Sequence, residues 1–249
     1  MGFYSAALAL VVPIMLQSLI GSMVSLVDNF MVAGLGDIKM AAVNVANQIN
    51  TIYFVLLNAT AIGGGIFLSQ HRGANDPDGM RQAYRFKLLV SLVFSLVHMA
   101  LCLFWAEPIL RLLLSSNREA PAIAAEGARY LRVLLVSSVP IAVSTATASA
   151  YRDIGKTSVP LAFSTAAALI NTFFNWVFIY GNLGSPRLEV SGAAIATNIA
   201  RLCEMGAFLA WTARQKPSFA FKPLRVFKID GRLFGSMLGK SGPIFFSET

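Results

Sequence analysis

Long apolar stretches dominate the pattern of hydrophobic and polar positions along this chain of 249 residues. Stretches of about 20 apolar residues recur, which is the length that an α-helix needs to cross roughly 30 Å of hydrocarbon. The pattern predicts six complete membrane-spanning helices and the start of a seventh, which begins near residue 233. The six predicted spans are residues 4–34, 41–69, 86–106, 128–150, 157–180 and 190–213.

The composition supports an all-α integral membrane protein. Hydrophobic residues make up 56% of the chain and charged residues only 13%, against roughly 45–50% and 25% in soluble domains. The connections between the early spans are short, so successive helices are expected to be antiparallel neighbours in a bundle. We therefore expect a six-helix transmembrane lobe over 1–213, a cytoplasmic linker over 214–232 and the start of a second lobe over 233–249.

The basic residues predict the orientation of the bundle, because cytoplasmic loops of membrane proteins carry an excess of Lys and Arg. The loops after the second, fourth and sixth spans hold Arg72, Arg81, Arg85, Lys87, Arg152, Lys156, Arg214, Lys216, Lys222, Arg225, Lys228 and Arg232. The loops on the other side hold Lys39, Arg111, Arg118, Arg129, Arg132 and Arg187. Twelve against six places the first set, and the N-terminus, in the cytoplasm. The net charge of +8 is dispersed, with no aromatic and basic platform, so a nucleic-acid partner is not expected.

Asp28 is the most notable polar residue within the apolar spans. It lies about six residues before the outer end of the first span, after an uncharged run from Met1 to Val27. A carboxylate within the membrane costs roughly 2.5–3.5 kcal/mol on insertion scales, so Asp28 is expected to face a protein interior or a water-filled cavity. The alternative is a carboxylate at a helix end that already lies among the lipid headgroups.

Amide and hydroxyl groups occur at the same expected depth as Asp28. Asn171 and Asn175 are four residues apart on the fifth span and share one helix face, and Thr197 and Asn198 lie on the sixth. At 1.5 Å per residue these groups fall roughly 8–14 Å below the outer surface. Oxygen ligands suit a hard cation, and a carboxyl group can instead carry a proton. The alternative role is ordinary hydrogen bonding between helices.

Other residues predict bending and close packing of the helices. Pro13 interrupts the first span, with Gln17 one turn later on the same face, so a bend there is either satisfied by side chains or mobile. Small residues at 63–65 and 192–194 allow helices to approach closely. Arg201 and Glu204 are three residues apart on the sixth span, a spacing that favours a structural ion pair.

A short repeated string indicates an internal duplication. The string Pro13-Ile14-Met15-Leu16-Gln17-Ser18 returns as Pro243-Ile244-Phe245-Phe246-Ser247-Glu248, and the two prolines are 230 residues apart. This spacing encloses six spans, as a duplicated six-helix bundle predicts. On this interpretation the chain is the N-terminal part of a longer protein.

Several strings together resemble the multidrug and toxic compound extrusion family. They are PIMLQSLIGSMVSLVDNFMVAGLG with MAAVNVANQI, then GGGIFLSQHRGAND, then YRDIGKTSVP, and finally INTFFNWVFIYGNLG with VSGAAIAT. They occur in the family's order over nearly the whole chain. The resemblance implies twelve helices in two lobes, of which this chain covers the first, and a bacterial inner membrane as the location.

The resemblance also implies a function and a set of residues. Organic, often cationic compounds leave the cell while Na⁺ or H⁺ enters, by alternating access and without a further cofactor. Asp28 matches the family's acidic residue of the first span, and Asn171 its Asn of the fifth. Asn175 occupies a position that is Asp in some members, Thr197 matches a Thr of the sixth span, and Glu248 matches an acidic residue of the seventh.

Three alternatives compete with this function. A related flippase for lipid-linked sugars shares the architecture but tends to have a more basic cavity. A truncated, non-transporting membrane fragment is the second alternative, because an isolated lobe lacks the C-terminal lobe that completes a cavity. An enzyme is not expected, since the sequence has no P-loop, Ser/His pair or metal-ligand cluster, and His71 and His98 are far apart.

Overall fold

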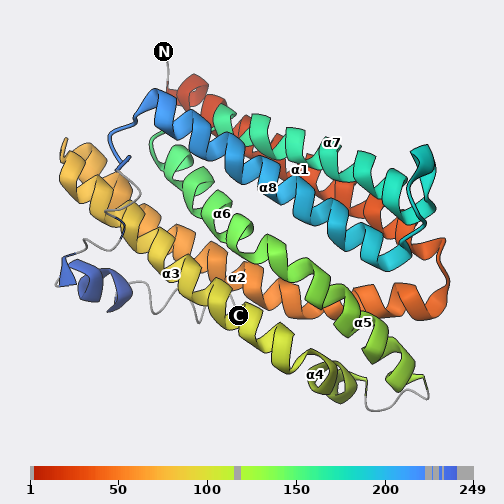
Figure 1. Cartoon of the computed structure of the whole chain (residues 1–249). Helices are drawn as coiled ribbons and strands as arrows, with labels where there is room; N and C mark the ends of the chain where they lie inside the picture. The colour runs from red at the N-terminus through yellow and green to blue at the C-terminus, as the bar shows by residue number, and fades with distance from the viewer. Residues whose placement is uncertain (1–2, 115–118, 222–225, 227–229, 232, 240–249) are drawn as a thin grey trace.

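The computed structural model describes residues 3–114, 119–221, 226, 230–231 and 233–239. Helices account for nearly all of this part of the chain, and Figure 1 shows them as one bundle. Their bounds are α1 Phe3–Ala33, α2 Asp37–Gly73, α3 Pro77–Phe104, α4 Ala106–Leu113, α5 Ala120–Leu134, α6 Ser138–Asp153, α7 Ser158–Tyr180 and α8 Glu189–Gln215. Two short 3₁₀ turns are η1 Leu135–Ser137 and η2 Asn182–Gly184.

Six helical segments of the described chain are long and apolar enough to cross a membrane, which confirms the predicted number of spans. They are Val11–Ala33, Asp37–Gly73, Pro77–Phe104, Ala120–Asp153, Ser158–Tyr180 and Glu189–Gln215. The third and fourth helical segments begin well before the predicted spans, at Pro77 and Ala120. The spans were predicted from apolar residues alone, whereas the helices continue into polar sequence.

Asp76 fixes the early start of α3. Its Oδ1 accepts hydrogen bonds from the backbone N–H groups of Asp78 at 3.1 Å and Gly79 at 3.0 Å, and Pro77 occupies the first helical turn. A side-chain acceptor and an early proline are the usual signals of a helix N-terminus. The N–H of Gly79, followed by the side chain of His71, holds the pKa of Asp76 below its ordinary value.

The fourth span is interrupted, which the apolar pattern did not predict. Pro140 has no N–H group and therefore cannot bond to the carbonyl one turn earlier, and the 3₁₀ turn η1 lies just before it. Side chains satisfy neighbouring carbonyls, as is common at breaks within membrane helices. Ser137 Oγ donates to Leu134 O at 2.6 Å, and Tyr53 of α2 donates to Ser138 O at 2.7 Å.

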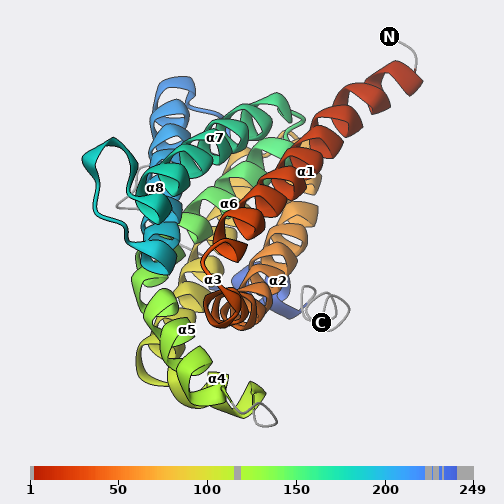
Figure 2. The same ribbon diagram turned by 90° about the vertical axis from the view of Figure 1, so that its right-hand side faces the viewer.

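Successive helices such as α7 and α8, or α2 and α3, pack as antiparallel neighbours, as expected. The contact between α1 and α7 is also extensive, but these two helices run in the same direction, since Gln17 lies beside Ser164 and Asp28 beside Asn175. Helix α1 lies at the edge of the bundle, as Figure 2 shows, and exposes large apolar side chains such as Met15, Met23 and Phe30. We call the end formed by the α2–α3 turn, the α6–α7 turn and residues 216–221 the basic end; it lies at the left of Figure 1.

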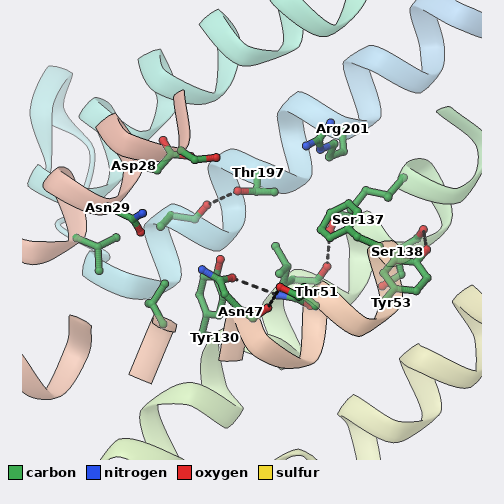
Figure 3. A pocket seen from close by; sticks show the side chains of 18 of the residues that line it. Asp28, Asn29, Asn47, Thr51, Tyr53, Tyr130, Ser137, Ser138, Thr197 and Arg201 are labelled. Atoms are coloured by element: carbon green, nitrogen blue, oxygen red, sulfur yellow. Dashed lines mark hydrogen bonds between the residues drawn. The ribbon is translucent and has the colours of Figure 1, made fainter. Parts of the chain in front are cut away.

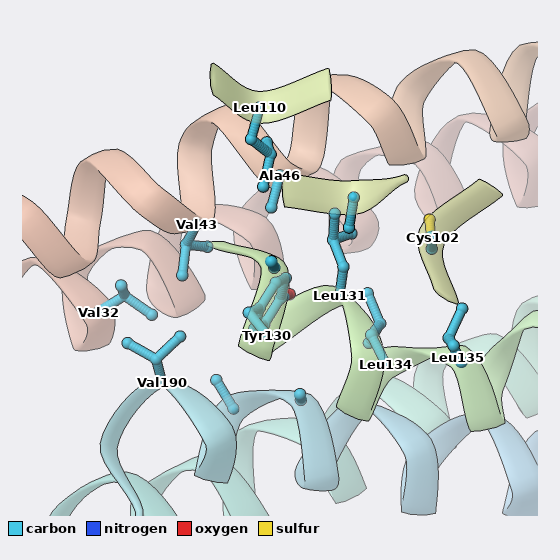
Figure 4. Close-up of a cluster of buried hydrophobic side chains, with 14 of the residues drawn as sticks. Val32, Val43, Ala46, Cys102, Leu110, Tyr130, Leu131, Leu134, Leu135 and Val190 are labelled. Carbon is cyan, nitrogen blue, oxygen red and sulfur yellow. The ribbon is translucent and has the colours of Figure 1, made fainter. Parts of the chain in front are cut away.

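Two apolar clusters lie at opposite ends of the bundle. The cluster in Figure 4 lies away from the basic end and joins Val32 of α1, Val43 of α2, Leu131 of α5 and Val190 of α8. Small residues allow the helices to approach closely, as predicted. A Cβ atom on Gly192 of α8 would lie 2.7 Å from the backbone of α7, too close for any side chain.

Aromatic residues after α8 complete the second cluster, at the basic end. Phe219 packs edge-on against Tyr84 of α3 and Tyr151 of α6, with ring centroids 4.9 and 5.3 Å away. Phe234 packs on Phe86 of α3 at 5.3 Å. Residues 233–239 are helical, whereas 240–249, with Pro243 and Glu248, lie outside the described residues. The predicted seventh span therefore stays a prediction.

Candidate functional site

Four of the residues selected from the sequence lie together between α1, α7 and α8. Asn175 Nδ2 donates to Asp28 Oδ1 at 2.6 Å and to Asn171 Oδ1 at 3.3 Å. Asn171 Nδ2 is 3.2 Å from Thr197 Oγ1, which in turn donates to the carbonyl of Ala193 at 3.0 Å. The face shared by Asn171 and Asn175 thus points at Asp28, as their spacing on one helix predicted.

The amide groups of this cluster can present either oxygen or nitrogen to Asp28. With its amide rotated by 180°, Asn171 donates to Asp28 Oδ2 at 3.0 Å and accepts from Thr197 Oγ1 at 3.2 Å. Asn175 is 2% exposed, and its Oδ1 has no hydrogen-bond partner among the described residues. A buried acceptor without a partner costs free energy, so Asn175 has a carbonyl oxygen available for a ligand.

Asp28 lies in the wall between two cavities, each of about 280 Å³. The first, the central cavity, is drawn in Figure 3: α1 and α8 contribute Asp28 and Thr197, and Asn47, Thr51 and Tyr130 come from α2 and α5. The second lies between α1, α7 and α8. A carboxylate with a cavity on either side is accessible to an ion from both.

Arg201 supplies a positive charge near this cluster. It lines both cavities beside Asp28, and its Nη1 donates to Glu204 Oε2 at 2.8 Å, which confirms the pairing that the sequence predicted. Glu204 Oε1 also accepts from Ser164 Oγ of α7 at 2.9 Å, and Gln17 Nε2 of α1 donates to Ser164 at 2.9 Å. A chain of hydrogen bonds therefore joins three helices.

The placement of Gln17 changes how the proline region of α1 is understood. Helix α1 continues through Pro13 without interruption. Gln17 does not satisfy the backbone of its own helix but bonds across to Ser164 on α7. Ser164 was not selected from the sequence, because an isolated serine in an apolar span carries no distinctive signal.

A second polar group on the cavity wall was also missed. His98 of α3 stacks on Tyr53 of α2, with ring centroids 4.3 Å apart, and its Nδ1 is 3.2 Å from Ser138 Oγ. Both rings line the central cavity. In the sequence His98 is an isolated histidine in a long apolar run, and only the folded bundle brings it beside Tyr53 and Ser138.

Comparison with known families identifies the chain. The MatE family model matches residues 13–177, a region that contains Asp28, Asn171 and Asn175. The chain belongs to the MatE family. Members of this family are multidrug efflux transporters, so the resemblance seen in the sequence strings is confirmed.

Individual relatives are bacterial transporters. The chain is 30% identical over 244 residues to the "Probable multidrug resistance protein NorM" of Bradyrhizobium diazoefficiens, covering 95% of this chain and 50% of that protein. It is 25% identical over 190 residues to the "Multidrug resistance protein PmpM" of Pseudomonas aeruginosa, covering 76% and 39%. This MatE chain thus spans half or less of the length of these relatives.

Solved structures confirm the fold of this MatE chain. The structure described as "Outward-facing conformation of a multidrug resistance MATE family transporter of the MOP superfamily" matches with a TM-score of 0.83 and 20% identity, covering 98% of this chain and 52% of that one. Another, "Crystal structure of MATE in the bent conformation", matches with a TM-score of 0.82 and 20% identity, covering 98% and 53%. The chain therefore has the fold of about half of a MATE transporter.

Proposed function

We propose that this chain is the N-terminal lobe of a secondary active efflux transporter, which exports organic, often cationic drugs in exchange for Na⁺ or H⁺. The names of the bacterial relatives support multidrug export. The observation that carries the proposal of ion coupling is the cluster in which Asn171, Asn175 and Thr197 surround Asp28. In this proposal the C-terminal lobe is the partner that completes the transport pathway.

The cluster can bind either coupling ion by a simple rearrangement. In the structure the amide nitrogen of Asn175 faces the carboxylate of Asp28, an arrangement that suits an ionised carboxylate without a bound metal. If Na⁺ binds, rotation of the Asn175 amide turns its oxygen toward the ion, beside the Asn171 oxygen that accepts from Asn175 in the structure, with Thr197 adding a hydroxyl oxygen. If H⁺ binds, Asp28 loses its charge and keeps one O–H donor. Both changes alter the hydrogen bonds between α1 and α7.

The mechanism that follows is alternating access, with α1 as the moving element. Asp28 and Gln17 both bond α1 to α7, and Pro13, four residues before Gln17, lacks the N–H group that would stiffen the helix there. An ion that rearranges the contacts of Asp28 therefore changes how firmly α1 is held beside the cavities. Binding shifts the population between two positions of α1.

The basic residues support an orientation with the basic end and the N-terminus in the cytoplasm of a bacterial inner membrane. In that orientation Asp28 lies in the outer half of the bundle, and Gln17 lies in the inner half. An exported compound then enters from the basic end. This orientation can be tested by replacing Lys156, at the basic end, or Arg187, at the opposite end, with Cys. The accessibility of each new thiol to a membrane-impermeant reagent is then measured.

The test of ion coupling is Asp28→Asn in the full-length transporter, expressed in a drug-sensitive bacterium. We expect loss of drug resistance, and loss of the drug-induced release of Na⁺ or H⁺ from ion-loaded inverted vesicles. Asn29→Ala is the matched control, because Asn29 also lines the central cavity but carries no charge. Resistance and ion dependence equal to wild type in Asp28→Asn would contradict the role of Asp28.

A further inference from the structure

A third cavity, which we call the inner cavity, lies between Asp28 and the basic end. Its volume is about 180 Å³, and five helices contribute to it: α1, α2, α6, α7 and α8. The residues of its wall that matter here are Asn58, Ser144, Arg152, Ser164, Arg201 and Glu204. Arg201 also lines both cavities beside Asp28, whereas Ser144, Arg152 and Glu204 line neither of them.

The inner cavity carries more positive than negative charge. Two arginines, Arg152 and Arg201, line it, against a single acidic residue, Glu204. Glu204 accepts from Arg201 and from Ser164, so its two oxygens are already engaged. Arg152 has no carboxylate within ion-pair distance in the described part of the chain, because Asp153, its neighbour in sequence, pairs with Lys87 instead.

An unpartnered hydroxyl group indicates that the inner cavity is built for a ligand. Ser144 of α6 is 4% exposed, and its Oγ has no hydrogen-bond partner among the residues that the structure describes. A buried polar group without a partner is costly, yet this one lies on the wall of the same cavity as the two arginines. A bound group with acceptor oxygens would satisfy Ser144 and the donors of Arg152 together.

We propose that the inner cavity binds the carboxylate group of a small organic ligand, between Arg152 and Arg201. A planar carboxylate can accept two parallel hydrogen bonds from a guanidinium group, an arrangement that a single ammonium does not reproduce. Carboxylate oxygens are also acceptors only, which matches the donors on this wall. Any role of this site in transport rests on the proposed function, whereas the binding of a carboxylate there does not depend on it.

Glu204 acts as an internal competitor for the ligand. In the structure its carboxylate occupies one N–H group of Arg201, in the way that a ligand carboxylate would. A ligand that displaces it also changes the hydrogen bond between Glu204 and Ser164, to which Gln17 of α1 is bonded. Occupancy of the inner cavity is thereby linked to the contacts that hold α1 against α7.

The experiment measures binding of benzoate to the purified 249-residue chain in lipid nanodiscs by titration calorimetry. Benzyl alcohol and benzylammonium are the neutral and cationic controls of similar size. We expect benzoate to bind at least about tenfold more tightly than benzyl alcohol. Arg152→Gln and Ser144→Ala are both expected to weaken the affinity for benzoate, Arg152→Gln by about tenfold. Arg187→Gln is the matched control, since its side chain is 58% exposed at the opposite end.

Glu204→Gln gives a result that misfolding cannot imitate. Because it frees Arg201 and removes the competing charge, it is expected to tighten benzoate binding severalfold. Equal binding of benzoate and benzyl alcohol, or benzoate binding that none of these variants changes, would overturn the proposal. So would benzylammonium binding that Glu204→Gln abolishes, because the cavity would then be a cation site. Benzoate binding by the wild-type chain, together with a wild-type transporter that shows no drug-induced movement of Na⁺ or H⁺, would refute the antiport and leave this site standing.

Discussion

The buried ion pair of Lys87 and Asp153 supports the sharpest prediction about stability. Lys87 of α3 is fully buried, and its Nζ pairs with Asp153 of α6 and donates to Ser149 Oγ at 2.9 Å. Gly64 of α2 makes room for it, since a Cβ atom there would lie 2.5 Å from Lys87 Cγ. The pair therefore joins α3 to α6 across the surface of α2.

Replacement of Lys87 by Met keeps the volume and removes the charge, which leaves the carboxylate of Asp153 mostly buried and unpaired. Its side chain is 16% exposed. Breaking a buried pair by removing one partner costs about 3–5 kcal/mol. In a chain of about 150–250 residues each kcal/mol lowers the melting temperature by about 2–4 °C, so we expect Lys87→Met to lower it by about 6–20 °C.

The assay is thermal unfolding of the detergent-solubilised chain in a Cys203→Ser background. The extent of unfolding at each temperature is measured by the labelling of the Cys102 thiol. Cys102 is 1% exposed, so its thiol becomes reactive only when the bundle opens. The exposed pair of Arg81 and Asp78, at 2.6 Å, provides the control: Arg81→Gln is expected to cost at most about 1 kcal/mol.

The double variant Lys87→Met with Asp153→Leu distinguishes charge from packing. With both charges gone, no unpaired carboxylate is left buried at this site, and an apolar pair of similar volume is often neutral or stabilising. We therefore expect the double variant to recover most of the loss. A melting temperature of Lys87→Met within about 2 °C of wild type, or a double variant that melts below the single one, would refute this reasoning.

Two further predictions concern single residues. Gly192→Ala is expected to lower the melting temperature in the same assay, because its new methyl group would lie 2.7 Å from the backbone of α7. Gly206→Ala is the control, since its methyl group would meet nothing within 4 Å. Equal melting temperatures of the two variants would contradict the close packing of α8 on α7. Since its folded-state pKa is lowered, Asp76 stabilises the start of α3 above its ordinary pKa of 3.8, and this contribution is lost as the pH falls below that value. The protection of the Gly79 N–H from hydrogen exchange, relative to its intrinsic exchange rate at each pH, should accordingly fall at low pH in wild type but not in Asp76→Asn, and a parallel fall in both would contradict the capping role.

The helical architecture could be predicted from the sequence because membrane spans impose a length and a composition on each helix. The six spans and their antiparallel order follow from apolar stretches and short connections alone. The break at η1 was not predicted, although Pro140 was visible, because proline is tolerated in membrane helices without a break. The early start of α3 was missed for a different reason: residues from Pro77 onward are polar, and only the capping by Asp76 marks them as helical.

The candidate site was predictable where polar residues share a helix face and a depth. Asp28, Asn171, Asn175 and Thr197 meet as those two criteria indicated. Contacts between side chains of distant helices could not be derived in this way. The bond from Gln17 to Ser164 depends on how α1 and α7 are rotated about their axes, which apolar helices with weak amphipathic patterns do not specify.

The aromatic residues after α8 have a consequence for synthesis of the protein. Tyr84 and Tyr151 belong to α3 and α6, which leave the ribosome early, but their rings pack against Phe219. The ring of Phe86 likewise packs against Phe234. During translation, which proceeds from the N-terminus, the basic end of the bundle stays incompletely packed until these later residues arrive. Completion of this helical bundle is thus coupled to synthesis of the residues that follow α8.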